Sequence, residues 1–283
     1  MPAFQLTELW VYPVKSLGGI RLKKSALLPK GLQYDRRWML TDINGRFLTQ
    51  REHHRLALFK TSFSADGQAL IITFENDNIT IPLQPPTDGQ LLHTVQIWDD
   101  YVQALEVGDS FSRWFSQRLQ SDAKLVYFPE PELRPVDNEY QVNRDHVSLA
   151  DAFPYLVIGQ SSLDDLNSRL DQKLPMNRFR PNFVVAGSQP FEEDTWLTVQ
   201  IGSCKFAAVK TCSRCIIPTI NQDTAERNAE PLKTLTTFRN FNHKIKFGMN
   251  LILLSGTEVH EGDAVVVEQT RPVAQHLTPE PQS

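Results

Sequence analysis

The first hundred residues alternate between hydrophobic and polar positions with a period of two, which is the pattern of half-buried β-strands. One such strand contains Leu9 and Val11. Another, residues 38–43, faces residues 46–49 across Asn44-Gly45, which is a two-residue hairpin signal. Similar short runs occupy residues 58–63, 70–74, 79–83, 94–98 and 101–107. Many short strands joined by turns indicate a barrel or a sandwich.

Three later segments have apolar residues at helical spacing. They are residues 111–119 behind Asp109 as a cap, residues 163–170 with Ser162 and Asp165 as a capping box, and residues 232–238 behind Pro231. Between them lie apolar strand runs at residues 124–128, 155–158, 183–186, 197–201, 205–210, 251–254 and 264–268. The pattern therefore predicts a mainly β fold with peripheral helices, in the α+β class.

The chain of 283 residues is long enough for one large domain or two of ordinary size. Residues 121–138 are proline-rich and lack periodicity, so we expect a boundary there. We assign residues 1–122 to an N-terminal β-barrel domain and residues 123–268 to a second domain. The composition of residues 269–283 is that of a tail or linker.

Composition narrows the classes of function. Lys and Arg number 29 against 33 Asp and Glu, a formal net charge of −4, which argues against a protein that coats nucleic acid. Hydrophobic residues make up 41%, enough for a sizeable core. We expect no membrane span, because no apolar run approaches the roughly 18 residues it needs. The N-terminus has no signal-peptide pattern, and the three cysteines are too few for a disulfide framework. We therefore expect a cytoplasmic protein.

The CSRC segment at residues 212–215 carries the most chemistry. A structural zinc site needs four ligands, and the only other cysteine is Cys204. A redox dithiol normally opens a helix, whereas the segment that follows, IIPTINQDT, is β-branched and broken by proline. Two buried, inert cysteines are a third possibility. Lys210 and Arg214 favour a thiolate, and a thiolate beside fixed cations suits a soft metal carried by an anionic cofactor.

Other basic residues stand beside strand ends or turns: Lys15, Arg36, Arg37 and Arg180. Arginine suits bidentate recognition of phosphate, but each of these side chains taken alone reads as a solvated surface charge. Spacing does not show that they converge on one site.

An ordered set of motifs identifies a family. The N-terminal part contains YPVKSLGGI, GLQYDRRWML and GRFLTQRE, and the C-terminal part contains NRFRPNFVVAG, EEDTW, KTCSRCIIPTINQDT, EPLKTLTTFR, FGMNLI and GDAVVV. From about residue 5 to 268 the chain resembles the MOSC proteins, named after the C-terminal domain of molybdenum-cofactor sulfurase. The match is closest to the bacterial YcbX proteins, and the chain also resembles the mitochondrial amidoxime-reducing component. The resemblance implies a MOSC β-barrel domain packed on a smaller N-terminal MOSC barrel.

The resemblance also implies a cofactor, Mo-molybdopterin, whose metal is bound by the cysteine that directly follows arginine, here Cys215. Cys212 would be a neighbour and Cys204 a core residue. The positions that match cofactor contacts of the family are Lys15, Ser16, Arg36, Asp151, Ala152, Phe153, Arg180, Ser213, Arg214 and Asn250, with Arg51 as a further candidate. Asp151 is our hypothesis for a catalytic group that handles protons or orients the substrate, against a plain role in capping a turn.

The family's activity would be reduction of N-hydroxylated compounds, namely amidoximes, hydroxylamines and N-hydroxylated nucleobases, by two-electron oxygen abstraction. YcbX proteins commonly continue into a [2Fe–2S] ferredoxin domain, which needs four more cysteines than this sequence holds. We therefore expect no iron–sulfur cluster in this chain, whether the domain is naturally absent or removed. Electrons would come from a separate flavoprotein reductase or ferredoxin-type protein. The alternative function is a cofactor or sulfur carrier in which Cys215 is a transient persulfide or docking residue.

Overall fold

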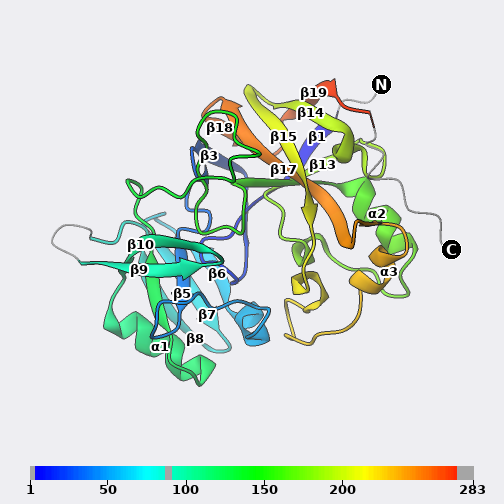
Figure 1. Ribbon diagram of the computed structural model, residues 1–283. Helices are drawn as coiled ribbons and strands as arrows, with labels where there is room; N and C mark the ends of the chain where they lie inside the picture. The colour runs from blue at the N-terminus through cyan, green and yellow to red at the C-terminus, as the bar shows by residue number, and fades with distance from the viewer. Residues whose placement is uncertain (1–3, 87–90, 273–283) are drawn as a thin grey trace.

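A closed barrel of seven strands forms the larger part of the molecule (Figure 1). The computed structural model describes residues 4–86 and 91–272. In order around the barrel the strands are β12 (Tyr155–Gly159), β13 (Phe183–Ala186), β1 (Phe4–Val11), β19 (Ala264–Thr270), β14 (Trp196–Ile201), β15 (Cys204–Ser213) and β17 (Lys244–Ser255). Pairing of β12 with β17 closes the ring, and β12 runs parallel only to β13. Short strands β2 (Ile20–Leu22) and β16 (Asn240–Phe241) extend β1 and β17.

A half-barrel forms the second part. One of its sheets has the order β5 (Trp38–Thr41), β11 (Lys124–Tyr127), β10 (Asp100–Glu106) and β9 (Leu92–Ile97). The other is a meander of β6 (Lys60–Phe63), β7 (Ala69–Phe74) and β8 (Asp77–Pro82). Helix α1 (Asp109–Leu119) packs on β11 and β8. A small third sheet contains β18 (Glu258–His260), β3 (Lys24–Leu28) and β4 (Gly31–Leu32), so it pairs a segment near the C-terminus with segments near the N-terminus.

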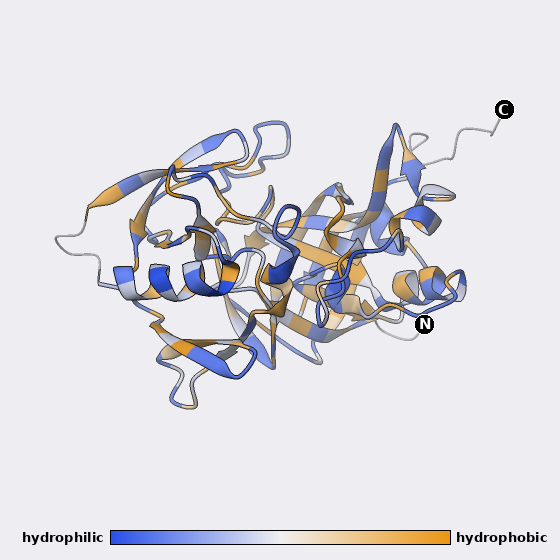
Figure 2. Ribbon diagram, turned by 90° about the horizontal axis from the view of Figure 1, so that it is seen from below, coloured by the Kyte–Doolittle hydropathy of each residue, from blue (hydrophilic) through white to orange (hydrophobic). Residues whose placement is uncertain are grey.

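The period-two pattern explains the barrel core. On β15 the side chains of Cys204, Phe206 and Ala208 point inward and are buried, while the residues between them are half-buried. Phe206 meets Tyr155 and Phe183 with ring centroids 5.4 and 5.5 Å apart. Burying such rings supplies much of the hydrophobic stabilisation of a β fold. In Figure 2 the barrel interior is largely hydrophobic and the loops around it are mostly hydrophilic.

The predicted mainly β class with three peripheral helices is confirmed. Two predicted helix starts are wrong. Helix α1 has Gly108 as its N-cap, so Asp109 lies inside the helix. Helix α2 (Gln160–Ser168) begins two residues before Ser162, whose hydroxyl donates to the buried carboxylate of Glu193 instead of capping. Helix α3 (Leu232–Thr236) follows Pro231, and short 3₁₀ turns span His54–Leu58, Met176–Arg178, Glu192–Thr195 and Ile217–Thr219.

Strands from each side of the boundary that we placed between residues 122 and 123 belong to the sheet on the other side of it. Strands β1 and β2 join the barrel, and β11 joins the four-stranded sheet of the half-barrel. The boundary itself stays a prediction. Of the predicted tail, residues 269–270 complete strand β19, and residues 273–283 lie outside the described residues. In the part of the chain that the structure describes, no helix has the length and apolar character of a membrane span.

Candidate functional site

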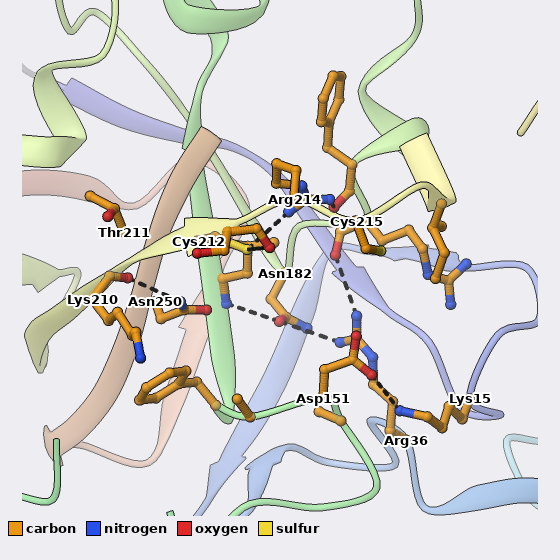
Figure 3. Close-up of a pocket in the computed structure, with 18 of the residues that line it drawn as sticks. Lys15, Arg36, Asp151, Asn182, Lys210, Thr211, Cys212, Arg214, Cys215 and Asn250 are labelled. Atoms are coloured by element: carbon orange, nitrogen blue, oxygen red, sulfur yellow. Dashed lines mark hydrogen bonds and ion pairs between the residues drawn. The ribbon is translucent and has the colours of Figure 1, made fainter. Parts of the chain in front are cut away.

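A cavity of about 400 Å³ collects side chains from both parts of the molecule (Figure 3). The loops that follow β1 and β4 and the loop that precedes β13 supply one side, and the end of β15 with the CSRC segment supplies another. Every site residue proposed from the sequence lines it: Lys15, Ser16, Arg36, Arg51, Asp151, Ala152, Phe153, Arg180, Ser213, Arg214, Cys215 and Asn250. The structure thus brings the set together, and the role of each residue stays a prediction.

Three of these residues have backbone in the left-handed region. The φ angle is 68° at Ser16, 47° at Arg36 and 55° at Arg180. Residues other than glycine avoid this region unless the surrounding structure holds them there, and such residues cluster at ligand sites. At Arg36 the backbone is held on both sides, since its N–H donates to Tyr12 O and its carbonyl accepts from Leu149 N. The surrounding structure therefore holds these three residues in an unfavourable backbone conformation, and in that conformation their side chains line the cavity.

Asp151 lies between two cations. Lys15 Nζ donates to its Oδ1 at 2.6 Å, and Arg51 Nη2 donates to its Oδ2 at 2.8 Å. Burial alone raises the pKa of Asp151, but the charges and hydrogen bonds of Lys15 and Arg51 outweigh it and hold that pKa well below its usual range. Burial lowers the pKa of Lys15 to about 8 although Asp151 opposes that effect. A carboxylate that stays ionised accepts hydrogen bonds, so this setting favours an orienting role for Asp151.

Two arginines stack on one tyrosine. The guanidinium carbons of Arg36 and Arg180 each lie 4.3 Å from the ring centroid of Tyr12. Arg36 is also paired with Asp35 at 2.5 Å, and Arg180 donates to Leu17 O at 2.7 Å. Burial lowers the pKa of Arg180 to about 10. The ring holds both cations side by side, a geometry suited to a phosphate group.

Sequence reasoning missed the residues that hold this pair. Tyr12 lies within the quoted motif YPVKSLGGI and Asp35 within GLQYDRRWML, yet neither was singled out. Asn182 was also missed: its Oδ1 accepts from Leu156 N at 3.1 Å and from Arg36 Nη1 at 3.4 Å. The signal was their place inside motifs otherwise rich in site residues. Their function depends on contacts between distant segments, which a sequence alone does not display.

The CSRC segment leaves strand β15 and enters the cavity wall. Arg214 anchors it, because its N–H donates to Ile245 O at 2.8 Å and its Nη2 donates to Phe179 O at 2.7 Å. Arg214 Nη1 also contacts Cys212 Sγ at 3.1 Å. Cys212 and Cys215 are both free, half-buried and exposed to the cavity. Arg51 interacts with Asp151 and with Cys215, and these two partners raise the pKa of Arg51 although burial lowers it.

The third cysteine behaves differently. Cys204 is fully buried in the barrel core and its thiol contacts Glu258 O at 3.0 Å. This confirms its expected place in the core. Among the described residues, no group of three or more His, Cys, Asp and Glu side chains is placed to hold a metal ion.

A lysine-rich end of the cavity lies outside the predicted set of cofactor contacts, although Lys210 was noted for its place beside the CSRC thiols. Lys210 and Lys244 line it, and Lys246 lies beside them with its Nζ donating to Ser213 Oγ at 2.7 Å. Burial, and then the charges of Lys210 and Lys244, lower the pKa of Lys246. Asn250 contributes to the same wall, where its Nδ2 donates to Lys210 O at 3.0 Å.

The donor set fits an anionic cofactor that carries a soft metal. Seven cationic side chains line the cavity, and among the described lining residues Asp151 is the only acid. Phosphate binds well to several fixed, charge-assisted donors, which the neighbouring Lys15, Arg36 and Arg180 provide. Sulfur is a suitable ligand for a soft metal centre, and Cys215 places a free cysteine side chain at the cavity wall. The residues present therefore fit the group that the sequence motifs imply.

Comparison with known proteins agrees with the fold. The MOSC N-terminal β-barrel domain matches residues 3–122, and the MOSC domain matches residues 144–266. The chain is 32% identical to mouse mitochondrial amidoxime-reducing component 1, with 83% of this chain and 71% of that protein covered. The human component 1 is 30% identical, with coverage of 92% and 82%. A rice molybdenum cofactor sulfurase is 30% identical over 91% of this chain, which spans only 33% of that protein. The chain belongs to the MOSC-domain family that includes the mitochondrial amidoxime-reducing components.

Proposed function

We propose that the protein is a molybdenum-dependent reductase of N-hydroxylated compounds, with amidoximes, hydroxylamines and N-hydroxylated nucleobases as substrates. The observation that supports it most directly is the position of Cys215, a free thiol on the wall of a strongly basic cavity. The similarity to amidoxime-reducing components over most of the chain points to the same activity.

Different residues would bind different parts of Mo-molybdopterin. Cys215 would bind the metal, while Lys15, Ser16, Arg36 and Arg180 would bind the phosphate. Bound in this way, the cofactor would supply two-electron abstraction of oxygen from the N–OH group. Asp151 keeps Lys15 and Arg51 in place through these two hydrogen-bonded ion pairs.

Protons and electrons must reach the site from elsewhere. Net reduction of R–NHOH to R–NH₂ and water consumes two electrons and two protons. The electrons would come from a separate flavoprotein reductase or ferredoxin-type protein.

A carrier of cofactor or sulfur is the second candidate. The similarity to a rice molybdenum cofactor sulfurase favours it, and two free cysteines at one cavity would suit transient persulfide chemistry. The two candidates differ in how tightly the metal is held, because a carrier must release what a reductase retains.

The test is to express the protein in a host that makes molybdenum cofactor and to measure its molybdenum content, its pterin fluorescence and its reduction of benzamidoxime by reduced methyl viologen. Near-stoichiometric metal with turnover is the expected result. Metal without turnover, under a reductant that needs no protein partner, would favour the carrier. Absence of both metal and pterin, in a host that loads a control molybdoenzyme, would contradict both candidates.

A further inference from the structure

Among the described residues, carboxylates pair directly with the cavity's cations at one end only. At the Lys15 end, Asp151 pairs with Lys15 and Arg51 at 2.6 and 2.8 Å, and Asp35 pairs with Arg36 at 2.5 Å. Figure 3 shows Lys210 on the other side of the cavity from Lys15 and Arg36, with Cys212 and Cys215 along the upper wall of the view. The cavity therefore has two separate cationic ends that share a wall with the thiols.

The lysine end is less well balanced. The charge of Asp194 reaches Lys246, but Asp194 is itself paired with Arg239. Within residues 4–86 and 91–272, no ion pair involves Lys210, Lys244 or Lys246. The β15–β17 ladder sets their positions, because Lys210 stands opposite Asn250 and Ser213 opposite Lys246. Ammonium groups held close together without counter-ions repel one another, so an anion that enters between them is stabilised.

An aromatic wall adjoins these lysines. Lys210 Nζ lies 4.0 Å from the ring centroid of Tyr140, and the Tyr140 ring packs edge-on against Phe153 at 5.7 Å. Phe153 lines the cavity directly. A flat aromatic group could pack against this wall while a charged substituent reached the ammonium group of Lys210.

We propose that Lys210, Lys244 and the Phe153–Tyr140 wall form a substrate subsite that selects planar N-hydroxylated compounds bearing an anionic substituent, a carboxylate or a phosphate. This inference rests on the proposed reductase function and names the substrate class within it. The subsite lies in the cavity wall with the thiols, so its occupant is a small molecule that reaches the reacting atoms. The same lysines could instead bind an acidic protein, such as an electron donor, at the mouth of the cavity. The experiment distinguishes binding of a small substrate from docking of such a protein.

The experiment compares 4-carboxybenzamidoxime with benzamidoxime, both reduced by the protein loaded with cofactor and supplied with reduced methyl viologen. The variants are Lys210→Gln, Lys244→Gln and the charge-preserving Lys210→Arg. The matched control is Lys205→Gln, on the same strand but paired with Glu268 at 2.9 Å and absent from the cavity wall. Molybdenum content is measured for every variant, so that loss of cofactor is recognised.

The wild type is expected to prefer the carboxylated substrate, with a preference that declines as salt is added. Lys210→Gln should lower the ratio of the two kcat/KM values about tenfold, the usual effect of losing one charge-assisted hydrogen bond. Lys210→Arg should keep most of the ratio, and Lys205→Gln should not change it. A phosphorylated substrate should follow the same order if the subsite reads charge rather than carboxylate shape.

Three outcomes would overturn the inference. The first is an equal ratio in wild type, Lys210→Gln and Lys244→Gln. The second is loss of molybdenum and pterin from the lysine variants, which would assign these lysines to the cofactor. The third is a defect seen with a protein electron donor but absent with methyl viologen, which would assign them to docking.

Failure of the reductase proposal would look different. If the loaded wild type reduces neither substrate, the subsite is tested by calorimetric binding of the two amidine products, 4-carboxybenzamidine and benzamidine. Tighter binding of the carboxylated amidine to wild type than to Lys210→Gln would support the subsite without any turnover. Equal binding of both amidines to both proteins would contradict it.

Discussion

The Nζ atom of Lys15 lies 2.6 Å from Oδ1 of Asp151, and this ion pair joins two loops that are 136 residues apart in the chain. The Lys15 side chain is only 5% exposed, while half of the Asp151 side chain faces the cavity. Lys15 also donates to Leu149 O at 2.9 Å. A buried ammonium group is tolerated here because a carboxylate and a carbonyl replace its lost hydration.

Asp151→Asn should therefore destabilise the protein, since it leaves Lys15 and Arg51 without their acidic partner. Half exposure of Asp151 weakens the interaction through solvent screening, so we expect a loss of about 1–2 kcal/mol in the free energy of unfolding at pH 7. Urea denaturation measures it. Glu52→Gln breaks the exposed Arg46–Glu52 pair and serves as the control, with a loss below about 0.5 kcal/mol.

The sign of the pH effect follows from the lowered pKa of Asp151. The stabilisation is present above the unfolded-state value near 4 and is lost as the pH falls below it. The gap between wild type and Asp151→Asn should shrink between about pH 5 and pH 3. A gap that stays constant over that range would contradict this account of the ion pair.

The two cysteines of the CSRC segment should respond differently to substitution. Cys215→Ala is expected to abolish molybdenum retention and activity, because it removes the proposed metal ligand. Cys212→Ala should be milder, since that thiol contacts Arg214 at 3.1 Å, which Phe179 O and Ile245 O also hold. Metal analysis with benzamidoxime turnover checks both. Equal and complete loss in the two variants would reject Cys215 as the sole ligand.

The ring of Tyr12 should matter more than its hydroxyl. The ring carries Arg36 and Arg180 at 4.3 Å each, whereas no hydrogen-bond partner for the buried hydroxyl occurs among the described residues. Tyr12→Phe is expected to keep the wild-type content of molybdenum and pterin. Tyr12→Leu removes both cation–π contacts, each worth about 0.5–2 kcal/mol, and should lower cofactor content severalfold. Loss of cofactor in Tyr12→Phe would assign the function to the hydroxyl instead.

The fold class could be predicted because its pattern is local. Strand β15 shows its inward side at alternate positions, and α1 shows its apolar face at helical spacing. The helix starts could not be predicted as reliably, because tertiary contacts compete for the same side chains. Ser162 illustrates this, because its position in the sequence fits a helix cap, but its hydroxyl donates a hydrogen bond to the buried carboxylate of Glu193.

The candidate site divides in the same way. Residues inside recognisable motifs, such as Arg180 and Cys215, were found through the family resemblance. Lys244 lies in none of the quoted motifs, and Tyr12 gave no sign of its role as the ring beneath Arg36 and Arg180; both roles arise only because the fold brings distant segments together. Strand β17 extends from Lys244 to Ser255, but the apolar run that predicted it covers only residues 251–254. Lys244, which lines the cavity, lies in the polar first part of the strand, outside that run.

Glu193 makes stability depend on pH in the direction opposite to Asp151. Burial, and then the charge of adjacent Asp194, raise the pKa of Glu193 to about 7. A carboxyl group whose folded-state pKa is raised contributes stability that is lost as pH rises from its unfolded-state value near 4.5 towards 7. Glu193→Gln keeps a neutral group of the same size beside Ser162 and removes this titration.

The variant should therefore gain stability relative to wild type as the pH rises. Each pKa unit corresponds to about 1.4 kcal/mol, so between pH 5 and pH 8 we expect a relative gain of about 2 kcal/mol. Urea denaturation of both proteins at the two pH values measures it. The absolute stability of Glu193→Gln at either pH does not decide the question, because the amide can lose one hydrogen bond to Gly159 N or Ser162 at both. A difference between the two proteins that is the same at pH 5 and pH 8 would show that Glu193 is ionised throughout, with its charge balanced inside the fold.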